Sequence, residues 1–159
     1  QSDRRQRQIW IETDPIPSSI WRVSADPAAA GGFDFAQVVQ SDLERSGRFK
    51  LRPREQMPAA PVRAEAVVAG DWRGLGVDYV VVGRSTPAAA GQVAVDFELL
   101  NILNGPRLLG ERVTVPVAQA RNGAHRISDR IHEKILGVRG AFATRIAYVS
   151  VDGKPPSQR

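Results

Sequence analysis

The sequence of 159 residues contains no cysteine and no uninterrupted apolar run as long as a membrane-spanning helix needs. Without cysteine, disulfide scaffolds, thiol catalysis and thiolate metal sites are excluded. A spanning helix requires about eighteen or more apolar residues in a row, so no such helix is expected here. The opening residues, QSDRRQRQ, are polar and basic with no apolar core behind them, and we therefore expect no secretory signal peptide in this chain.

The motifs that mark common enzyme classes are also missing. No Walker glycine loop, GxGxxG, GxSxG elbow or HExxH occurs in the sequence. The sequence therefore gives none of the usual indications of a phosphate-binding, dinucleotide-binding, hydrolase or zinc-protease family. We expect a protein that is not an enzyme and that holds no cofactor.

The composition is that of a soluble globular domain, with 42% apolar and 25% charged residues. The length suits a single domain with a core of its own. The formal net charge is +5, and arginine supplies nearly all of the positive charge. Because the arginines are spread along the chain, the charge alone is weak support for a nucleic-acid partner.

Basic residues are densest around residues 45–54, where they alternate with Phe49 and Leu51. Such alternation is typical of a strand with one buried and one solvated face. The alternative is a stripe that binds polyanions or nucleic acid, but the aromatic residues that would stack on bases are missing. The basic residues concerned are Arg45, Arg48, Lys50, Arg52 and Arg54.

Periodicity predicts an α/β layered domain with a mixed sheet. We expect helices over 34–46 and 120–136, with Gly137 ending the second, and a short helix over 71–75 capped by Asp71. Strands are expected over 49–53 and 78–85, followed by an antiparallel hairpin within 92–117. The run 78–85 is apolar throughout, which indicates a central strand. Pro15 and Pro17 limit the pieces before residue 30 to edge or loop-flanked strands.

Two groups of polar residues could carry chemistry. His125, Asp129 and His132 follow each other at helical spacing, so they could share one helix face and bind a metal. A solvated or interface-facing helix surface is the preferred interpretation, because the sequence implies no partner carboxylate elsewhere. Asp96 and Glu98 alternate on one strand as a glycosidase pair might, but without sugar-stacking aromatics they indicate a solvated sheet face. No metal site is predicted.

The stretch AHRISDRIHEKILGVRGAFATRIAYV, residues 124–149, resembles the signature of the TolB family of the Tol-Pal envelope system. SDLERSGRF, residues 41–49, and DWRGLGVDYVVVG, residues 71–83, resemble two further parts of that family in order and spacing. The residues that carry the resemblance include Asp42, Leu43, Ser46, Gly47, Trp72, Gly83, His125, Asp129, Glu133, Gly137, Arg139, Gly140, Phe142, Thr144, Arg145 and Tyr148.

The resemblance implies a three-layer α/β/α domain with a mixed sheet of about five strands, similar to anticodon-binding domains. It also implies a non-enzymatic adaptor in the periplasm that links the TolA C-terminal domain to Pal, without nucleic acid, in outer-membrane integrity and constriction during cell division. In the family a segment near the N-terminus contacts TolA, while a β-propeller carries most of the Pal surface. The matching segment here would be Ile9, Trp10, Ile11, Glu12, Thr13 and Asp14.

The same resemblance gives an expected division of the chain. Residues 1–30 match the family poorly, because Ser18 and Ser19 stand where apolar strand residues would be expected. Residues 31–137 would form the α/β domain, and residues 138–159 a hinge and the first strand of a β-propeller that this chain lacks. The residues of that strand, Ile146, Tyr148 and Val149 among them, would then be poorly buried or would pack on the α/β domain.

Overall fold

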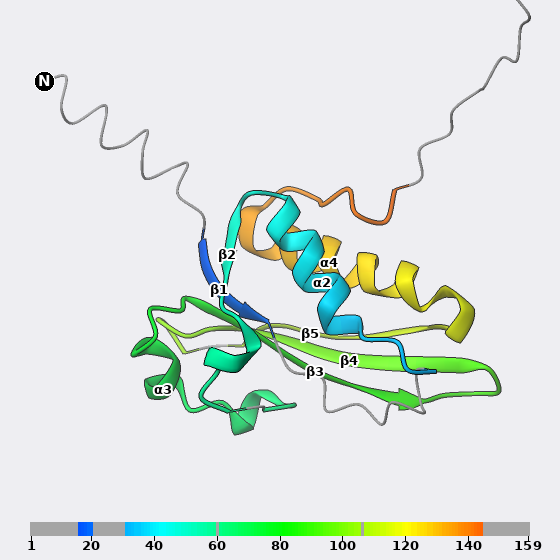
Figure 1. Cartoon of the computed structure of the whole chain (residues 1–159), viewed down its shortest axis with the longest axis horizontal. Coiled ribbons are helices and arrows are strands. Elements are labelled where there is room, and N and C mark those ends of the chain that lie inside the picture. The colour runs from blue at the N-terminus through cyan, green and yellow to red at the C-terminus, as the bar shows by residue number, and fades with distance from the viewer. Residues whose placement is uncertain (1–15, 21–30, 60, 106, 145–159) are drawn as a thin grey trace, which may run out of the picture.

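The computed structural model describes residues 16–20, 31–59, 61–105 and 107–144 (Figure 1). In chain order its elements are β1 (Ile16–Ile20), α2 (Phe35–Arg45), β2 (Phe49–Leu51), the 3-10 turns η1 (Arg54–Gln56) and η2 (Ala64–Ala66), α3 (Ala69–Arg73), β3 (Tyr79–Pro87), β4 (Gln92–Asn101), β5 (Arg107–Pro116), η3 (Val117–Gln119) and α4 (Ala120–Leu136).

In the described part of the chain the strands form one five-stranded sheet in the order β2-β1-β3-β4-β5. β1 runs parallel to β2 and β3, whereas β3, β4 and β5 form antiparallel pairs. The sheet is therefore mixed, as predicted. β3 lies at its centre and is buried over most of its length, which confirms the interpretation of the apolar run 78–85.

β1 corrects part of one expectation from the sequence. The prolines indicated edge or loop-flanked strands at best, and β1 lies not at an edge but between β2 and β3. The pairing is staggered: residues 16–18 face β2 and residues 18–20 face β3. Pro17 therefore lies in the part of β1 that pairs with β2 and not in the part that pairs with β3. Its missing N–H removes only one donor from the hydrogen bonds between β1 and β2. The sheet thus includes a strand ahead of residue 31, where the α/β domain was expected to begin.

The two long helices, α2 and α4, cover one face of the sheet (Figure 1). α2 begins after Asp34, whose carboxylate accepts a 3.0 Å hydrogen bond from the Gln37 N–H, an ordinary N-cap. α4 ends at Gly137, which adopts a left-handed conformation with φ of 70°. Both helices lie within one or two residues of the predicted ranges, because capping and apolar periodicity are local signals.

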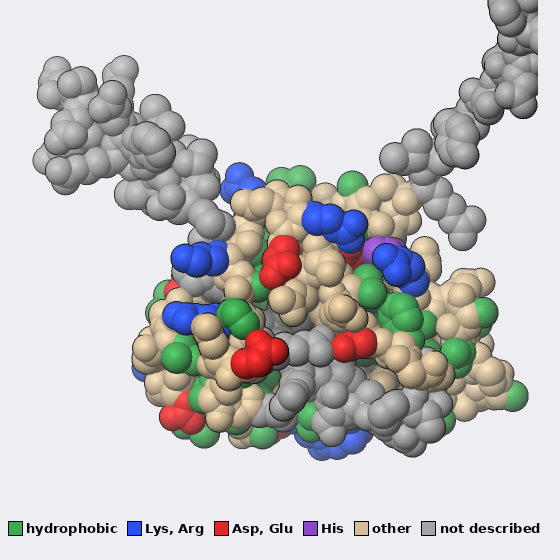
Figure 2. Space-filling model, in the orientation of Figure 1, with side chains coloured by type: hydrophobic (Ala, Val, Ile, Leu, Met, Phe, Trp, Pro, Cys, Tyr) green, Lys and Arg blue, Asp and Glu red, His purple; other side chains and the backbone are tan. Residues whose placement is uncertain are grey.

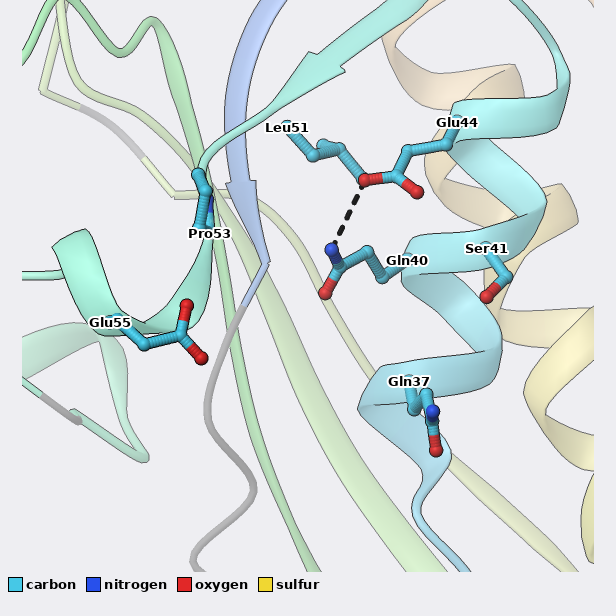
Figure 3. A pocket seen from close by; sticks show the side chains of 7 residues that line it. All are labelled: Gln37, Gln40, Ser41, Glu44, Leu51, Pro53 and Glu55. Carbon is cyan, nitrogen blue, oxygen red and sulfur yellow. Dashed lines mark hydrogen bonds between the residues drawn. The ribbon is translucent and has the colours of Figure 1, made fainter.

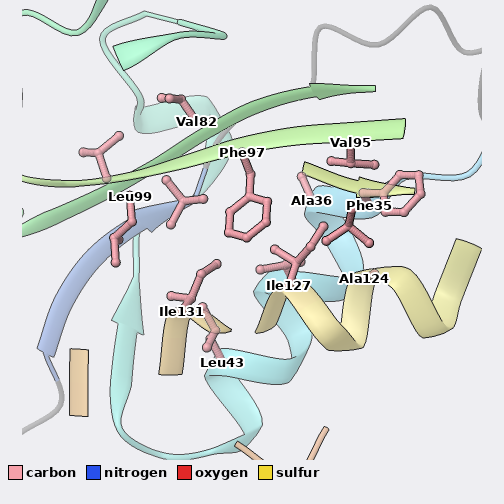
Figure 4. Close-up of a cluster of buried hydrophobic side chains, with 14 of the residues drawn as sticks. Phe35, Ala36, Leu43, Val82, Val95, Phe97, Leu99, Ala124, Ile127 and Ile131 are labelled. Carbon is pink, nitrogen blue, oxygen red and sulfur yellow. The ribbon is translucent and has the colours of Figure 1, made fainter. Parts of the chain in front are cut away.

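The core lies between these helices and the sheet (Figure 4). Side chains of β4 that point toward the helices alternate with residues on the other face, and they pack against α2 and α4. Burial of apolar area of this kind is the main favourable term in folding. Among the fully buried side chains are Phe35, Leu43, Val95, Phe97, Leu99, Ile127 and Ile131.

The connection from β2 to β3 lies against the opposite face and forms a thin third layer. Its η2 turn is held to the sheet by a 2.8 Å hydrogen bond from the Ala64 N–H to Glu98 Oε2. Trp72 of α3 is buried. α3 begins two residues earlier than predicted, and its N-cap is Val68, so the expected cap at Asp71 is wrong. The predicted three-layer α/β class with about five strands is confirmed.

Candidate functional site

A buried carboxylate joins the two long helices. Asp42 of α2 is only 2% exposed, and its Oδ2 atom lies 2.6 Å from His125 Nδ1 and 2.8 Å from Ser128 Oγ, both on α4. Its Oδ1 atom accepts a 2.9 Å hydrogen bond from Arg45. A buried carboxylate is costly unless its oxygens are hydrogen-bonded, and these three donors meet that requirement. We call these residues the interhelical joint.

The joint contains the residue types of a catalytic triad but not the geometry of one. In a triad the serine donates to the histidine, which then acts as a base. Here Ser128 and His125 both direct a proton at the same carboxylate, and Ser128 Oγ has Ala124 O, at 3.1 Å, as its other partner. Ser128 is also fully buried. The joint therefore connects two helices and has no exposed nucleophile.

A second carboxylate on α4 holds the segment that leaves the helix, residues 138–144, which we call the exit strap. Asp129 is 7% exposed and accepts hydrogen bonds from the Phe142 N–H at 2.8 Å and the Ala143 N–H at 3.2 Å. A Cβ atom at Gly140 would lie 2.5 Å from Asp129 Oδ1. Only glycine therefore lets the strap approach the carboxylate this closely.

His132 fixes the strap at a further point. Its Nδ1 donates to the Val138 carbonyl at 2.8 Å, and its ring makes edge contacts with Phe49 of β2 and Phe142 of the strap. Phe142 also packs on the core. The strap is thus held through two α4 side chains, and it passes over the ends of the helices on the side away from the sheet (Figure 1).

These contacts correct the interpretation of the histidine face. Asp129 is buried rather than solvated, and the partner carboxylate that the sequence did not reveal is Asp42, which lies 83 positions before His125. A sequence signal did exist, because Asp42 falls on the apolar stripe of α2. In the described part of the chain no group of three or more His, Asp or Glu residues is arranged to hold a metal ion.

The other described residues of the family motif serve packing and capping. Leu43 and Trp72 lie in the core. Ser46 caps α2 through a 2.6 Å hydrogen bond to the Leu43 carbonyl, and a Cβ at Gly83 would meet the Asp96 carbonyl at 2.7 Å. Gly47 and Gly137 have positive φ angles, which glycine adopts without strain. Glu133 forms an ion pair with Arg130, and Thr144 Oγ1 donates a hydrogen bond to the Ala141 carbonyl. Arg139 is exposed.

Some predicted residues lie outside the described part of the structure. These are the segment Ile9 to Asp14, assigned to TolA binding, and the motif residues Arg145 and Tyr148. The strand expected over Arg145–Val151, with Ile146 and Val149, also lies outside it. Their roles remain predictions.

The acidic pair on β4 lies on the sheet face away from the long helices, and this face is less solvated than predicted, because the side chains of Asp96 and Glu98 are only 32% and 17% exposed. Asp96 forms two hydrogen bonds with Arg112 of β5, at 2.7 and 2.9 Å, and these hold the pKa of its carboxyl below the ordinary value. Glu98 accepts a 2.7 Å hydrogen bond from Arg107. Carboxylates already paired with arginine are poor candidates for acid and base roles.

A hollow of about 370 Å³ lies between α2 and the segment that follows β2 (Figure 3). Within it, Gln40 Nε2 donates a 3.1 Å hydrogen bond to Glu44 Oε1. Among the described residues that line it there is no histidine, lysine or arginine to pair with its carboxylates. The lining residues are Gln37, Gln40, Ser41, Glu44, Leu51, Pro53 and Glu55.

The basic cluster does not form a continuous stripe. Arg45 is engaged by Asp42, and Arg52 donates to the Leu75 carbonyl and to Gln56, which leaves Arg48 and Lys50 as exposed cations in the described part of the cluster. Figure 2 shows Lys and Arg side chains as separate patches with acidic side chains between them. This arrangement gives the polyanion-binding hypothesis no support.

Within the described residues, no helix combines the length and the apolar character that a membrane crossing demands.

Comparison with known proteins identifies the family. Residues 12–108 match the model of the TolB amino-terminal domain. The Tol-Pal system protein TolB of Thioalkalivibrio sulfidiphilus is 42% identical over 133 residues, which is 84% of this chain and 31% of that protein. TolB of Xylella fastidiosa strain M12 is 41% identical over 134 residues, with 84% of this chain and 30% of that protein covered.

The structural comparison agrees. The crystal structure of TolB from Acinetobacter baumannii superimposes with a TM-score of 0.69 at 30% identity, over 82% of this chain and 31% of that one. The chain thus spans about a third of the length of the relatives it matches. It belongs to the TolB family of the Tol-Pal system, and it corresponds to the amino-terminal domain of that family.

Proposed function

We propose that this chain is a non-enzymatic periplasmic adaptor domain that links TolA to Pal and supports outer-membrane integrity and constriction during cell division. The observation that carries the proposal is membership of the TolB family, seen in the match of residues 12–108 and in relatives named as Tol-Pal system proteins. Such an adaptor acts by binding its partners, so its function depends on its binding surfaces rather than on a catalytic site.

The internal geometry supports a role without catalysis. Among the described residues, the side chains that sequence analysis considered for chemistry are engaged in structural contacts. Asp42, His125 and Ser128 join two helices, and Asp129 and His132 hold the exit strap. A catalytic acid or base needs access to a substrate, and the carboxylates of Asp42 and Asp129 are buried against their partners.

We assign TolA recognition to residues 9–14, which end two positions before β1 begins. Three apolar residues are followed by three polar ones in IWIETD, and we expect this segment to bind as an extended peptide that adds a strand to an exposed sheet edge of its partner. In that mode main-chain hydrogen bonds supply affinity and alternate side chains supply specificity. The principal Pal surface is assigned to the propeller of longer family members.

A binding experiment with the TolA C-terminal domain tests the assignment. The chain and a version lacking residues 1–14 are each immobilised for a pull-down of TolA. Their affinities for TolA are also measured in solution by calorimetry. We expect binding to the full chain and its loss on deletion. Circular dichroism and the melting temperature serve as the control, because the deletion stops before β1 and should leave the domain folded. Unchanged binding after the deletion would refute the assignment to residues 9–14.

A point variant sharpens the experiment. Replacing Trp10 by Ala removes the largest apolar side chain of the segment, and aromatic anchors dominate many interfaces. We expect TolA affinity to fall by about tenfold or more. The matched control is Arg121→Gln, which replaces an exposed residue of α4 that is distant in sequence from residues 9–14. This variant should bind TolA with unaltered affinity.

A further inference from the structure

A cleft of about 300 Å³ lies where β5, α4 and the exit strap meet. We call it the arginine cleft, because four of the residues that line it are arginines. Its lining residues are Glu111, Arg112, Val113, Arg126, Asp129, Arg130, Glu133, Arg139 and Ala143.

The carboxylates of this cleft are already occupied. Glu111 and Glu133 both bind Arg130, with shortest contacts of 2.5 and 2.6 Å, and Asp129 accepts the strap N–H groups. The hydrogen bonds from Arg130 also hold the pKa of Glu111 below its ordinary value. These acids are therefore already paired and are not available to a further cation.

Two guanidinium groups are left over. Arg126 of α4 and Arg139 of the strap are exposed, and neither has an acidic partner among the described residues. An arginine presents a planar fork of donors that matches a carboxylate, and such charge-assisted pairs are stronger than neutral hydrogen bonds. The cleft thus offers an anionic group of a partner two guanidinium groups that no described carboxylate occupies.

The strand that lines the cleft is the outermost described strand of the sheet. Glu111, Arg112 and Val113 are consecutive residues of β5, so their side chains alternate between the two faces. The cleft touches all three of these residues. β5 is the last strand in the sheet order, and no described strand pairs with that edge. Its outward N–H and C=O groups are therefore open to an added strand.

We propose that the arginine cleft binds an extended acidic segment of a protein partner, which pairs with the outer edge of β5 and places carboxylates on Arg126 and Arg139. Side chains of an added strand alternate between faces, so acidic residues at every second position would all point toward α4. The cleft is lined by none of residues 9–14, and the proposal does not depend on the proposed function.

The test uses a short labelled peptide in which Glu alternates with Val, and its affinity for the chain is measured by fluorescence anisotropy. We expect saturable binding that weakens as salt rises, with amide shifts along β5 in NMR spectra. A peptide with Gln in place of each Glu should bind about tenfold or more weakly. Absence of binding, or equal binding of the two peptides, would overturn the proposal.

Paired variants locate the charge contacts. The double variant Arg126→Gln, Arg139→Gln should bind the acidic peptide with an affinity lower by about tenfold or more. The matched control is Arg48→Gln with Arg121→Gln, which removes the same charge from two other exposed arginines that lack an acidic partner among the described residues. The control should bind as the original chain does. An equal loss in both double variants would indicate attraction to bulk charge, as for any polyanion, and would refute a site in the cleft.

N-methylated peptides test the pairing with β5. Along an added strand alternate N–H groups face β5 and the others face solvent. Two peptides are made, each N-methylated at one of the two alternating sets of amides. We expect one peptide to lose binding and the other to keep it. Equal affinity of the two would overturn the edge-strand mode. Failure here would leave the TolA experiment unaffected.

Discussion

Asp129 and Phe142 are joined by a 2.8 Å hydrogen bond between a buried side chain of α4 and a backbone N–H thirteen positions later. The contact holds the exit strap against the helix it has just left. The Asp129 carboxylate thus fixes the position of Phe142 and Ala143 in the strap. The Gly140 backbone passes close to the same carboxylate.

Replacing Asp129 by Asn should loosen the strap. The amide keeps one oxygen acceptor, but its NH₂ group would face a backbone N–H, so one of two hydrogen bonds is lost. We expect the free energy of unfolding to fall by about 1–3 kcal/mol. Urea denaturation measures this loss, and faster amide exchange at Phe142 and Ala143 locates it. Glu133→Gln removes an exposed carboxylate of the same helix and should change stability by less than about 1 kcal/mol.

Gly140→Ala should have a comparable effect for a steric reason. The new Cβ would lie 2.5 Å from Asp129 Oδ1, so strap and helix must move apart. We expect a loss of about 1–3 kcal/mol, measured by urea denaturation. Gly70→Ala is the control: a Cβ there meets no atom within 4 Å, and alanine should stabilise α3 slightly. If Gly140→Ala were neutral, the close approach of strap and carboxylate would be wrong.

Local patterns in the sequence were sufficient to predict α4, β3 and the β4–β5 hairpin, because periodicity, capping and turn residues act within a few positions. Contacts between distant residues were not predictable in the same way. Asp42 was visible as a carboxylate on an apolar stripe, but its partner His125 could not be named, since pairing across 83 positions depends on how the helices pack. The central place of β1 was missed because staggered pairing made a proline tolerable there.

Asp42→Ala should be the most destabilising single change in the interhelical joint. It removes the carboxylate acceptor of the part-buried His125 ring and of Ser128, whose hydroxyl keeps only the Ala124 carbonyl as a partner. Removal of one member of a buried charged network costs about 3 kcal/mol or more. Thermal and urea unfolding measure the loss.

A double-mutant cycle separates coupling from packing in the joint. Ser128→Ala alone should cost about 1 kcal/mol, since the Asp42 carboxylate keeps its other donors. The double variant Asp42→Ala, Ser128→Ala should be less destabilised than the sum of the two single variants, because both single changes break the same hydrogen bond. Strict additivity would show that Ser128 and Asp42 contribute independently, contrary to the 2.8 Å contact.

Acidification should weaken the domain partly through the two arginine pairs of β5. Hydrogen bonds from Arg112 and Arg130 lower the pKa values of Asp96 and Glu111 from their ordinary values of 3.8 and 4.5. A carboxyl whose pKa is lower in the folded state contributes its full stability above the unfolded pKa, and that contribution is lost as pH falls through the folded pKa. The loss should therefore begin below about pH 4.5 for Glu111 and continue at lower pH for Asp96.

The variant Arg130→Gln isolates the Glu111 part of this pH dependence. Without its partner, the Glu111 carboxyl should titrate closer to its ordinary pKa, which carbon NMR of that group measures directly. The free energy of unfolding should then fall less steeply with acid than in the original chain, and the two curves should converge at the lowest pH because Glu111 is protonated in both. Arg121→Gln, an exposed change without an acidic partner among the described residues, should run parallel to the original curve at every pH. A difference between Arg130→Gln and the original chain that does not vary with pH would mean that Arg130 stabilises β5 and α4 by packing of its stem rather than by its charge.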